Sequence, residues 1–116
     1  MRLAKKFITQ LDDDVMPVWD FRLPDGEKPV RDASAAAVVV CGFQELAKHQ
    51  ATDSEIIKAK DALLDRLCSD DYLDFNDDCP GVLKCAYGNK VAYSSWGDYF
   101  LMEALSRELK MGETFW

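Results

Sequence analysis

Cysteine and histidine are the residue types in this chain best suited to binding a transition metal. The sequence has four cysteines, Cys41, Cys68, Cys79 and Cys85, and one histidine, His49. No two cysteines have the C-x-x-C spacing of a zinc or redox motif. A zinc site is hard to assemble from this set, so we expect no metal centre. Reduced thiols are typical of proteins in the cytoplasm, and we predict that location.

Composition and charge narrow the class of protein. The chain has 116 residues, of which 48% are hydrophobic and 30% charged, as in one globular domain. Its net charge of −7 argues against a nucleic-acid surface, which would be basic. No segment reaches the roughly 18 apolar residues that span a membrane, and the start of the chain lacks the apolar core of a signal peptide. We therefore expect neither nucleic acid nor membrane as a partner.

Apolar residues at helical spacing predict four helices. The first covers residues 1–10 and should stop before three consecutive aspartates, which oppose the negative end of its dipole. The second covers residues 35–48, and either Asp32 or Ser34 can cap it.

The other two helices follow clear start signals. A Thr-x-x-Glu capping box at residues 52–55 precedes an amphipathic stretch that ends near Leu67. The last helix covers residues 96–110, with Ser94 or Ser95 as its cap.

Two long loops separate these helices. Residues 12–31 contain three prolines and an Asp-Gly turn, and loops of this length are usually functional or disordered. Trp19 and Phe21 favour an ordered loop. Residues 69–80 are acidic and turn-like. Residues 81–93 carry Gly-Asn between two short β-prone runs, which predicts either a small hairpin or a plain loop.

The second helix has an unusual composition. From Ala35 to Phe43 it contains no charged residue, and a helix that is apolar all round is buried all round. Three other helices cover it thinly. An exposed face forfeits several kcal/mol at ~25 cal/mol per Å² of apolar area. The pattern therefore predicts one sector of a larger two-layer helical array, with inner apolar and outer amphipathic helices.

Four segments together carry a resemblance to a known family. They are WDF at 19–21, RDASAAA at 31–37, CGFQEL at 41–46 and SWGDYFLMEAL at 95–105. In this order they resemble the unsaturated glucuronyl hydrolases of glycoside hydrolase family 88. The related unsaturated rhamnogalacturonyl hydrolases share the architecture and are a close alternative.

The resemblance implies a mainly α fold, the (α/α)6 barrel, or alpha/alpha toroid, of six outer and six inner helices. Family members are about three times longer than this chain. Residues 1–116 would therefore form a single helical unit of about four helices, the C-terminal sector of the barrel.

The resemblance also implies an unusual hydrolysis. The substrates are lyase-generated oligosaccharides that end in a 4,5-unsaturated uronic acid. An aspartic acid protonates the sugar double bond and activates water, and the hemiketal that forms then collapses. No cofactor is required. No segment of this chain matches the family's catalytic aspartates or its uronate-binding histidine, so we assign no catalytic residue and expect the chain alone to be inactive.

Substrate contact is the remaining site prediction. Trp19 would lie near the barrel mouth and could stack on a sugar, or it could instead fix the loop to the rim. Asp20 could bind sugar hydroxyls, although bonding to loop amides is simpler. The family's sugar- and sulfate-reading loop matches this chain in residue type at Lys90, Ser94 and Ser95, beside Trp96.

A different class of function is also open. The chain could be a non-catalytic interaction or oligomerisation module that self-associates through its apolar helix around Val38–Phe43. A solenoid repeat is not favoured, because the sequence has no period of 30 to 45 residues.

Overall fold

Four helices make up the regular structure in the part of the chain that is described. The computed structural model describes residues 1–49, 53–86 and 89–111. The helices are α1 (Arg2–Ile8), α2 (Ala33–His49), α3 (Ser54–Leu67) and α4 (Ser95–Glu108). The mainly helical fold predicted from the sequence is confirmed. Within the described residues, no helix is long and apolar enough to cross a bilayer.

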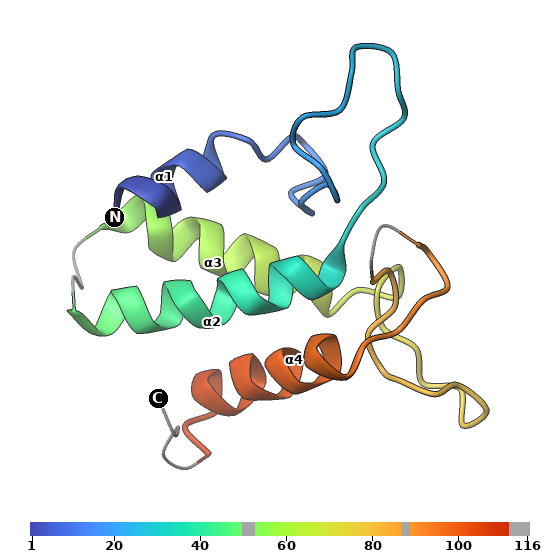
Figure 1. Cartoon of the computed structure of the whole chain (residues 1–116). Coiled ribbons are helices and arrows are strands. Elements are labelled where there is room, and N and C mark those ends of the chain that lie inside the picture. The colour runs from blue at the N-terminus through green and yellow to red at the C-terminus, as the bar shows by residue number, and fades with distance from the viewer. Residues whose placement is uncertain (50–52, 87–88, 112–116) are drawn as a thin grey trace.

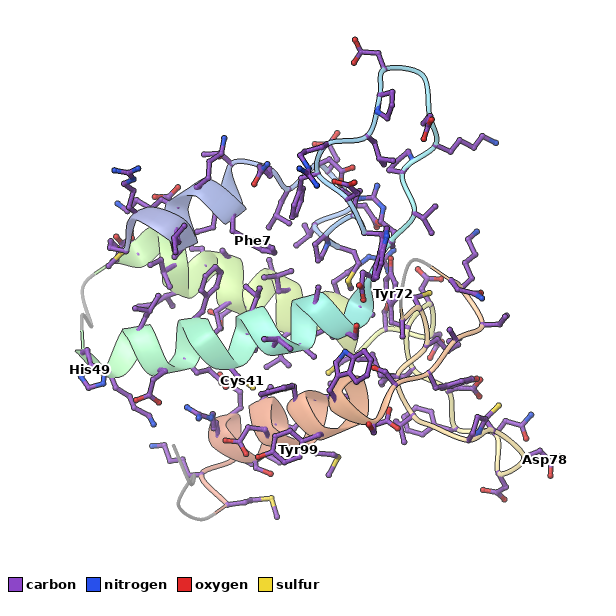
Figure 2. All side chains as sticks on the ribbon, viewed as in Figure 1. Phe7, Cys41, His49, Tyr72, Asp78 and Tyr99 are labelled. Atoms are coloured by element: carbon purple, nitrogen blue, oxygen red, sulfur yellow. The ribbon has the colours of Figure 1, made fainter. Side chains whose placement is uncertain are left out.

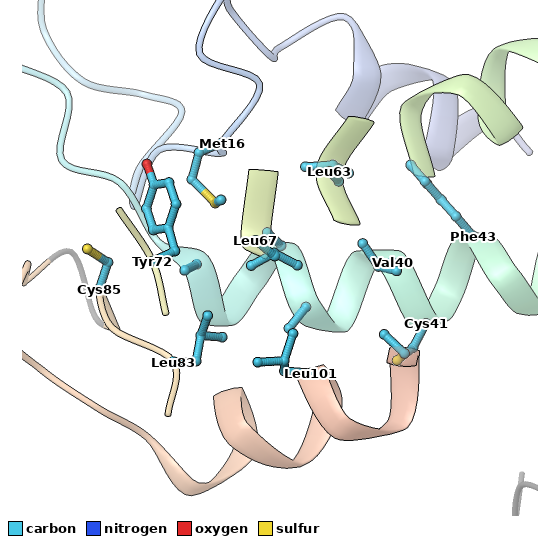
Figure 3. Close-up of a cluster of buried hydrophobic side chains, with 14 of the residues drawn as sticks. Met16, Val40, Cys41, Phe43, Leu63, Leu67, Tyr72, Leu83, Cys85 and Leu101 are labelled. Carbon is cyan, nitrogen blue, oxygen red and sulfur yellow. The ribbon is translucent and has the colours of Figure 1, made fainter. Parts of the chain in front are cut away.

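The helix α2 lies between α3 and α4, and α1 lies against α3 (Figure 1). Apolar side chains from the three longer helices fill the space between them (Figure 3). Val40 and Cys41 of α2, Leu63 of α3 and Leu101 of α4 are all buried there. This packing is the hydrophobic core.

Side-chain caps set where the longer helices begin. Asp32 Oδ1 accepts hydrogen bonds from the backbone N–H groups of Ser34 and Ala35, at 3.0 and 3.2 Å. Of the two caps proposed for α2, Asp32 is therefore the right one. The Ser34 hydroxyl instead donates to Asp32, at 2.6 Å. Because the cap is Asp32, α2 begins two residues earlier than the hydrophobic pattern suggests.

The caps of α3 and α4 follow the same logic. The predicted cap of α3, Thr52, lies outside the described residues. The structure places the cap at Asp53, whose side chain accepts from the N–H groups of Glu55 and Ile56. Ser94 caps α4, since its hydroxyl accepts from Gly97 N–H at 3.0 Å. Ser95, the other candidate, is the first residue of the helix.

The loops contain only isolated β-bridges in the part that the structure describes. Residues 81–93 form no strand ladder there, and single bridges join Leu73 to Leu83 and Ala86 to Asn89. Gly88, the expected turn residue of a hairpin, lies outside the described residues. Of the two structures proposed for this segment, the described part corresponds to the plain loop.

The apolar helix α2 is buried on the sides that face α3 and α4, but not all round. Ala36, Ala37 and Val40 have no exposed surface, whereas Val38 is 40% exposed. The thin cover that the sequence predicts for α2 within this chain is therefore seen on one face. The reason is that α1 is a short helix and covers that face incompletely.

Candidate functional site

The first loop, residues 9–32, joins α1 to α2 and carries two of the candidate residues. Its neck is closed by hydrogen bonds from Trp19 N–H to the Val30 carbonyl (2.7 Å) and from Asp32 N–H to the Pro17 carbonyl (2.9 Å). Residues 19–30 therefore form a loop that is closed at its base and projects from the start of α2 (Figure 1).

Trp19 and Asp20 sit just beyond this neck. Trp19 is 55% exposed. Asp20 Oδ1 accepts a hydrogen bond from Arg22 N–H at 2.8 Å, so the loop-amide bond expected as the simpler role is present. A hollow of about 430 Å³ beside them is lined by Asp20, Phe21 and the Pro24–Glu27 turn, among other residues.

Aromatic rings attach the loop to the helices. The Phe21 ring meets the Phe7 ring of α1 edge to face, with centroids 5.7 Å apart. Phe7 in turn meets Phe43 of α2, with centroids 6.2 Å apart. Edge-to-face contacts are the favoured geometry for such pairs. The loop, α1 and α2 are thus joined by one row of three rings.

A cluster of charges fixes the base of the first loop. Asp14 accepts from Arg66 Nη2 of α3 at 2.7 Å, and its other oxygen lies 3.2 Å from Arg31 Nε. Arg31 also makes a two-pronged contact with Asp12 at 3.0 and 2.7 Å. Because Asp14 pairs with both arginines, it ties both ends of the loop to α3. Hydrogen bonding to Arg31 lowers the pKa of Asp12.

This cluster was missed at the sequence level. The aspartates at positions 12–14 indicate only the end of a helix, and nothing in the sequence around Arg66 predicts its partners. The structure also places Tyr72 in the cluster, with its hydroxyl 3.3 Å from Asp14 Oδ2. Burial raises the pKa of Tyr72 to about 12, so its hydroxyl remains a donor at neutral pH.

The second loop, residues 68–94, contains the candidates Lys90 and Ser94. The candidates Ser95 and Trp96 follow it at the start of α4. Asp98 in the first turn of α4 accepts from the N–H groups of Val82 and Leu83, at 3.0 and 2.8 Å. A side chain at Gly97 would lie 2.8 Å from the Ser94 hydroxyl and 3.2 Å from Ser34 Cβ. Glycine thus allows the start of α4 to approach the start of α2 closely.

The four candidate residues in the second loop and at the start of α4 differ in their exposure to solvent. Ser94 is buried and engaged as the helix cap, so its hydroxyl already serves a structural role. Lys90 and Ser95 are exposed, and Trp96 is partly exposed. Of the four, Ser94 is thus the least available to a substrate.

The two loops meet at one end of the helix bundle. A hydrogen bond from Ala33 N–H to the Cys85 carbonyl, 2.9 Å long, joins the start of α2 to the second loop. All six candidate residues therefore belong to the end at which α2 and α4 begin (Figure 1). His49 lies at the far end of α2, and the Asp78 tip of the second loop lies on the loop side (Figure 2).

A second polar cluster holds the acidic part of the second loop. Asp74 Oδ2 accepts from the Tyr93 hydroxyl at 2.6 Å and from the Cys79 thiol at 3.2 Å. The Tyr93 hydrogen bond and further donors lower the pKa of Asp74 to about 2, and the same bond raises the pKa of Tyr93. Within the described residues, no group of three or more acidic, cysteine or histidine side chains is placed to hold a metal ion.

The charge state of the carboxylates bears on catalysis. Among the described residues, five carboxylates have a shifted pKa, and in each the nearby cations and N–H or O–H donors lower it: Asp12, Glu45, Asp53, Asp74 and Glu108. A general acid at neutral pH needs a raised pKa. None of these five groups is therefore suited to protonate a substrate.

Comparison with known proteins gives the class of the fold. A crystal structure of the unsaturated glucuronyl hydrolase from Bacillus sp. GL1 superposes with a TM-score of 0.76 at 30% identity. The match covers 92% of this chain and 31% of that one. A mutant of the Streptococcus agalactiae unsaturated glucuronyl hydrolase gives 0.75 at 29% identity, over 98% of this chain and 34% of that one. The fold is thus part of an alpha/alpha toroid.

Sequence comparison agrees. The chain is 34% identical to the unsaturated chondroitin disaccharide hydrolase of Streptococcus pneumoniae strain R6, over 95% of this chain and 30% of the relative. It is 31% identical to the Bacillus sp. GL1 unsaturated glucuronyl hydrolase, over 99% of this chain and 33% of the relative. No protein-family model matches. The chain is homologous to the unsaturated glucuronyl hydrolases, and it spans about a third of their length.

Proposed function

We propose that the chain forms the C-terminal sector of an unsaturated glucuronyl hydrolase barrel, and that this barrel acts on oligosaccharides ending in a 4,5-unsaturated uronic acid. The observation that carries the proposal is the superposition on the Bacillus sp. GL1 enzyme, with a TM-score of 0.76 over 92% of this chain. The sequence relatives are hydrolases of unsaturated chondroitin disaccharide and of unsaturated glucuronyl groups, which supports the substrate class.

The reaction would be hydration of the sugar double bond, followed by release of the shortened sugar. A carboxyl group that performs it must be protonated at working pH, which requires a raised pKa. The carboxylates with shifted pKa in this chain have it lowered. No segment of this chain matches the family's catalytic aspartates, so the catalytic acid would come from another part of the barrel and the isolated chain would not turn over substrate.

The chain would contribute substrate contacts at the end of the helix bundle where α2 and α4 begin. Trp19 is half exposed and would stack on a sugar, and Lys90 offers an exposed cation for a carboxylate or sulfate group. Ser95 and Trp96 lie at the start of α4, beside the Ser94 cap. Asp20 retains one oxygen for a sugar hydroxyl, because its Arg22 contacts use only Oδ1.

A chimera tests this function. The segment of the Bacillus sp. GL1 enzyme that matches this chain is replaced by residues 1–116, and loss of the enol-ether ultraviolet absorbance is followed with an unsaturated disaccharide. We expect turnover by the chimera and none by the 116-residue chain alone. A folded chimera without activity, or turnover by the chain alone, would overturn the proposal.

Two point variants of the chimera test the site. Trp19→Ala and Lys90→Ala should raise KM by about tenfold, the size of one stacking or charged contact of roughly 1.4 kcal/mol. Lys58→Ala on the outer face of α3 is the matched control and should leave KM unchanged. An unchanged KM in both site variants would remove the two residues from the site.

The cellular setting is proposed from the thiols. All four cysteines are free in the structure, as expected where glutathione keeps thiols reduced. We therefore place the breakdown of these oligosaccharides in the cytoplasm. Isolation of the chain from cells under alkylating conditions, with mass spectrometry, would reveal a disulfide that contradicts this location.

A second candidate function rests on the incompletely covered face of α2. A non-catalytic module would associate with another chain, a second copy included, through residues Val38–Phe43. The 40% exposure of Val38 favours this candidate. Light scattering on the purified chain tests the self-association version, because a monomer at all concentrations counts against it.

A further inference from the structure

The turn that leads from α1 into the first loop contains a strained residue. Val15 has a φ of +68°, in the left-handed region that few residues other than glycine enter. Valine is β-branched, and β-branched residues are true outliers there. A residue persists in such a conformation only where the surrounding structure imposes it, and such residues gather at functional sites. The contacts that hold this turn therefore bear on the site.

The residues on either side of Val15 are both fixed. Met16 has no exposed surface, and its carbonyl accepts a hydrogen bond from Arg31 Nη1 at 2.8 Å. Asp14 uses both of its carboxylate oxygens. Oδ1 accepts from Arg66 Nε and Nη2 at 3.0 and 2.7 Å, and Oδ2 lies 3.2 Å from Arg31 Nε. The turn thus lies between a buried side chain and a carboxylate with two arginine partners.

The support for Asp14 lies largely outside the first loop. Arg66 belongs to α3, and its guanidinium carbon lies 4.8 Å from the centre of the Tyr72 ring. Arg66 Nη1 also pairs with Asp71 at 2.6 Å. Tyr72 is 4% exposed, and its hydroxyl lies 3.3 Å from Asp14 Oδ2. Asp14 therefore connects the first loop to a helix and to the hydrophobic core.

The turn leads directly to the neck of the loop. Two residues after Val15, the Pro17 carbonyl accepts from Asp32 N–H at 2.9 Å. Two residues further on, Trp19 N–H donates to the Val30 carbonyl at 2.7 Å. Since the chain is held at each of these steps, a shift of the turn would move the neck and the Trp19 ring with it.

We propose that Asp14 is a positioning residue for substrate binding, which holds the left-handed turn at Val15 against α3 and so sets where the Trp19 ring lies. This inference rests on the proposed function, in which Trp19 contacts the sugar. Asp14 itself touches no substrate in this role, because both of its oxygens are engaged by arginines. Loss of the carboxylate would displace the ring without removing it.

A purely structural role for Asp14 makes different predictions. A carboxylate that only stabilises the fold would lower the unfolding temperature when replaced, and the folded enzyme would keep its KM. A positioning residue changes KM and leaves kcat nearly unaffected, since the ring binds the sugar equally in the ground state and the transition state. Comparison of KM with kcat therefore separates the two roles.

A double-mutant cycle in the chimera tests the proposal. Asp14→Asn keeps the shape of the side chain but removes its charge, and it should raise KM about threefold to tenfold with kcat nearly unchanged. In the Trp19→Ala background the same substitution should have almost no further effect on KM, because the ring that Asp14 positions is gone. Asp13→Asn, at the exposed next residue, is the matched control and should leave KM unchanged in both backgrounds.

Hydrogen exchange on the same chimeras gives a readout that needs no turnover. In Asp14→Asn the amides of Trp19 and Asp32, which close the neck, should exchange at least about tenfold faster, whereas peptides from α4 keep the wild-type rate. Mass spectrometry follows both segments. If Asp14→Asn does not fold, Arg66→Lys replaces it in both experiments, because lysine keeps the charge but loses the two-point contact with Asp14.

Several results would overturn the proposal. They are an unchanged KM in folded Asp14→Asn, effects on KM that multiply in the double variant, unchanged exchange at the neck, and faster exchange throughout the chimera. Failure of the proposed function is distinguishable from these. A folded wild-type chimera without turnover rejects the proposed function, whereas turnover with a KM that Asp14→Asn leaves unchanged rejects only the positioning role.

Discussion

The two sides of α2 have nearly the same composition but very different surroundings. On one side, Ala36, Ala37, Val40 and Cys41 pack against α3 and α4 with no exposed surface. On the other, Val38, Val39 and Gly42 line an open groove that α1 covers only in part. Hydrophobicity alone thus does not decide whether a helix face is buried in this chain. The partner that the fold places opposite the face decides it.

We call the side of α2 that packs against α3 and α4 the closed side, and the side that lines the groove the open side. The largest effect of a substitution is expected on the closed side. Leu63→Ala removes a side chain with no exposed surface in α3, in the core cluster that α2 shares. We expect a loss of about 2–5 kcal/mol in the free energy of unfolding, from lost burial and the cavity left behind. Urea denaturation measures it. A loss below about 1 kcal/mol would mean that the core between the helices collapses around the gap.

A pair of identical substitutions compares the two sides directly. Val40→Ala on the closed side should cost about 2 kcal/mol, whereas Val38→Ala on the open side should cost less than about 1 kcal/mol. The residue types and the helix are the same, and only the exposure differs, at 0% and 40%. Equal costs in urea denaturation would show that the groove is covered in solution.

The rim of the closed side should respond to acid. Glu45 of α2 pairs with Lys48 and with Arg107 of α4, both at 2.8 Å. Hydrogen bonding, first to Lys48 and then to Arg107, lowers the pKa of Glu45 from 4.5 to about 2. A folded-state pKa below the unfolded value means that the stabilisation is complete above about pH 4.5 and is lost as the pH falls towards 2.

Thermal unfolding from pH 6 to pH 2 measures this contribution. In Glu45→Gln the fall of Tm over the interval from pH 4.5 to about 2 should be shallower than in the wild type. Glu27→Gln in the exposed part of the first loop is the control and should follow the wild-type curve. High salt should reduce the difference, because the pair is partly exposed. Parallel curves for Glu45→Gln and the wild type would remove Glu45 from the acid response.

The smallest effect concerns reactivity rather than stability. Burial raises the pKa of the Cys41 thiol to about 11, and the thiol lies 3.3 Å from the Phe100 carbonyl. Cys68 at the end of α3 is exposed. In iodoacetamide at pH 8, Cys68 should be modified well before Cys41, because the thiolate is the nucleophile and needs access. Peptide mass spectrometry reads the order, and equal rates would mean that the closed side opens readily.

Local signals in the sequence were sufficient for the helices. The apolar helix α2 and a serine cap for α4, at Ser94 or Ser95, were predictable because composition and caps depend on residues within one or two turns. The cap of α3 at Asp53 was missed because Thr52 three residues before Glu55 matched a capping box more closely. Two adjacent capping residues compete, and spacing alone does not choose between them.

The candidate site was predictable only in part. The motifs named Trp19, Lys90 and their neighbours, but their placement at one end of the bundle follows from contacts between distant residues. Asp14 and Arg66 are 52 positions apart in sequence, and nothing local to either predicts that they pair. The cap role of Ser94 makes it a poor substrate ligand, which becomes visible only once its hydroxyl is seen to accept from Gly97.

The row of three aromatic rings has a consequence for thermodynamic linkage. Phe7 lines the α1–α2 groove and also meets Phe21 of the first loop, two residues after Trp19. A displacement of Phe7 would therefore change the energy of the loop position as well as the wall of the groove. Coupling free energies are reciprocal, so a change that moves the first loop would act on the groove with the same coupling free energy.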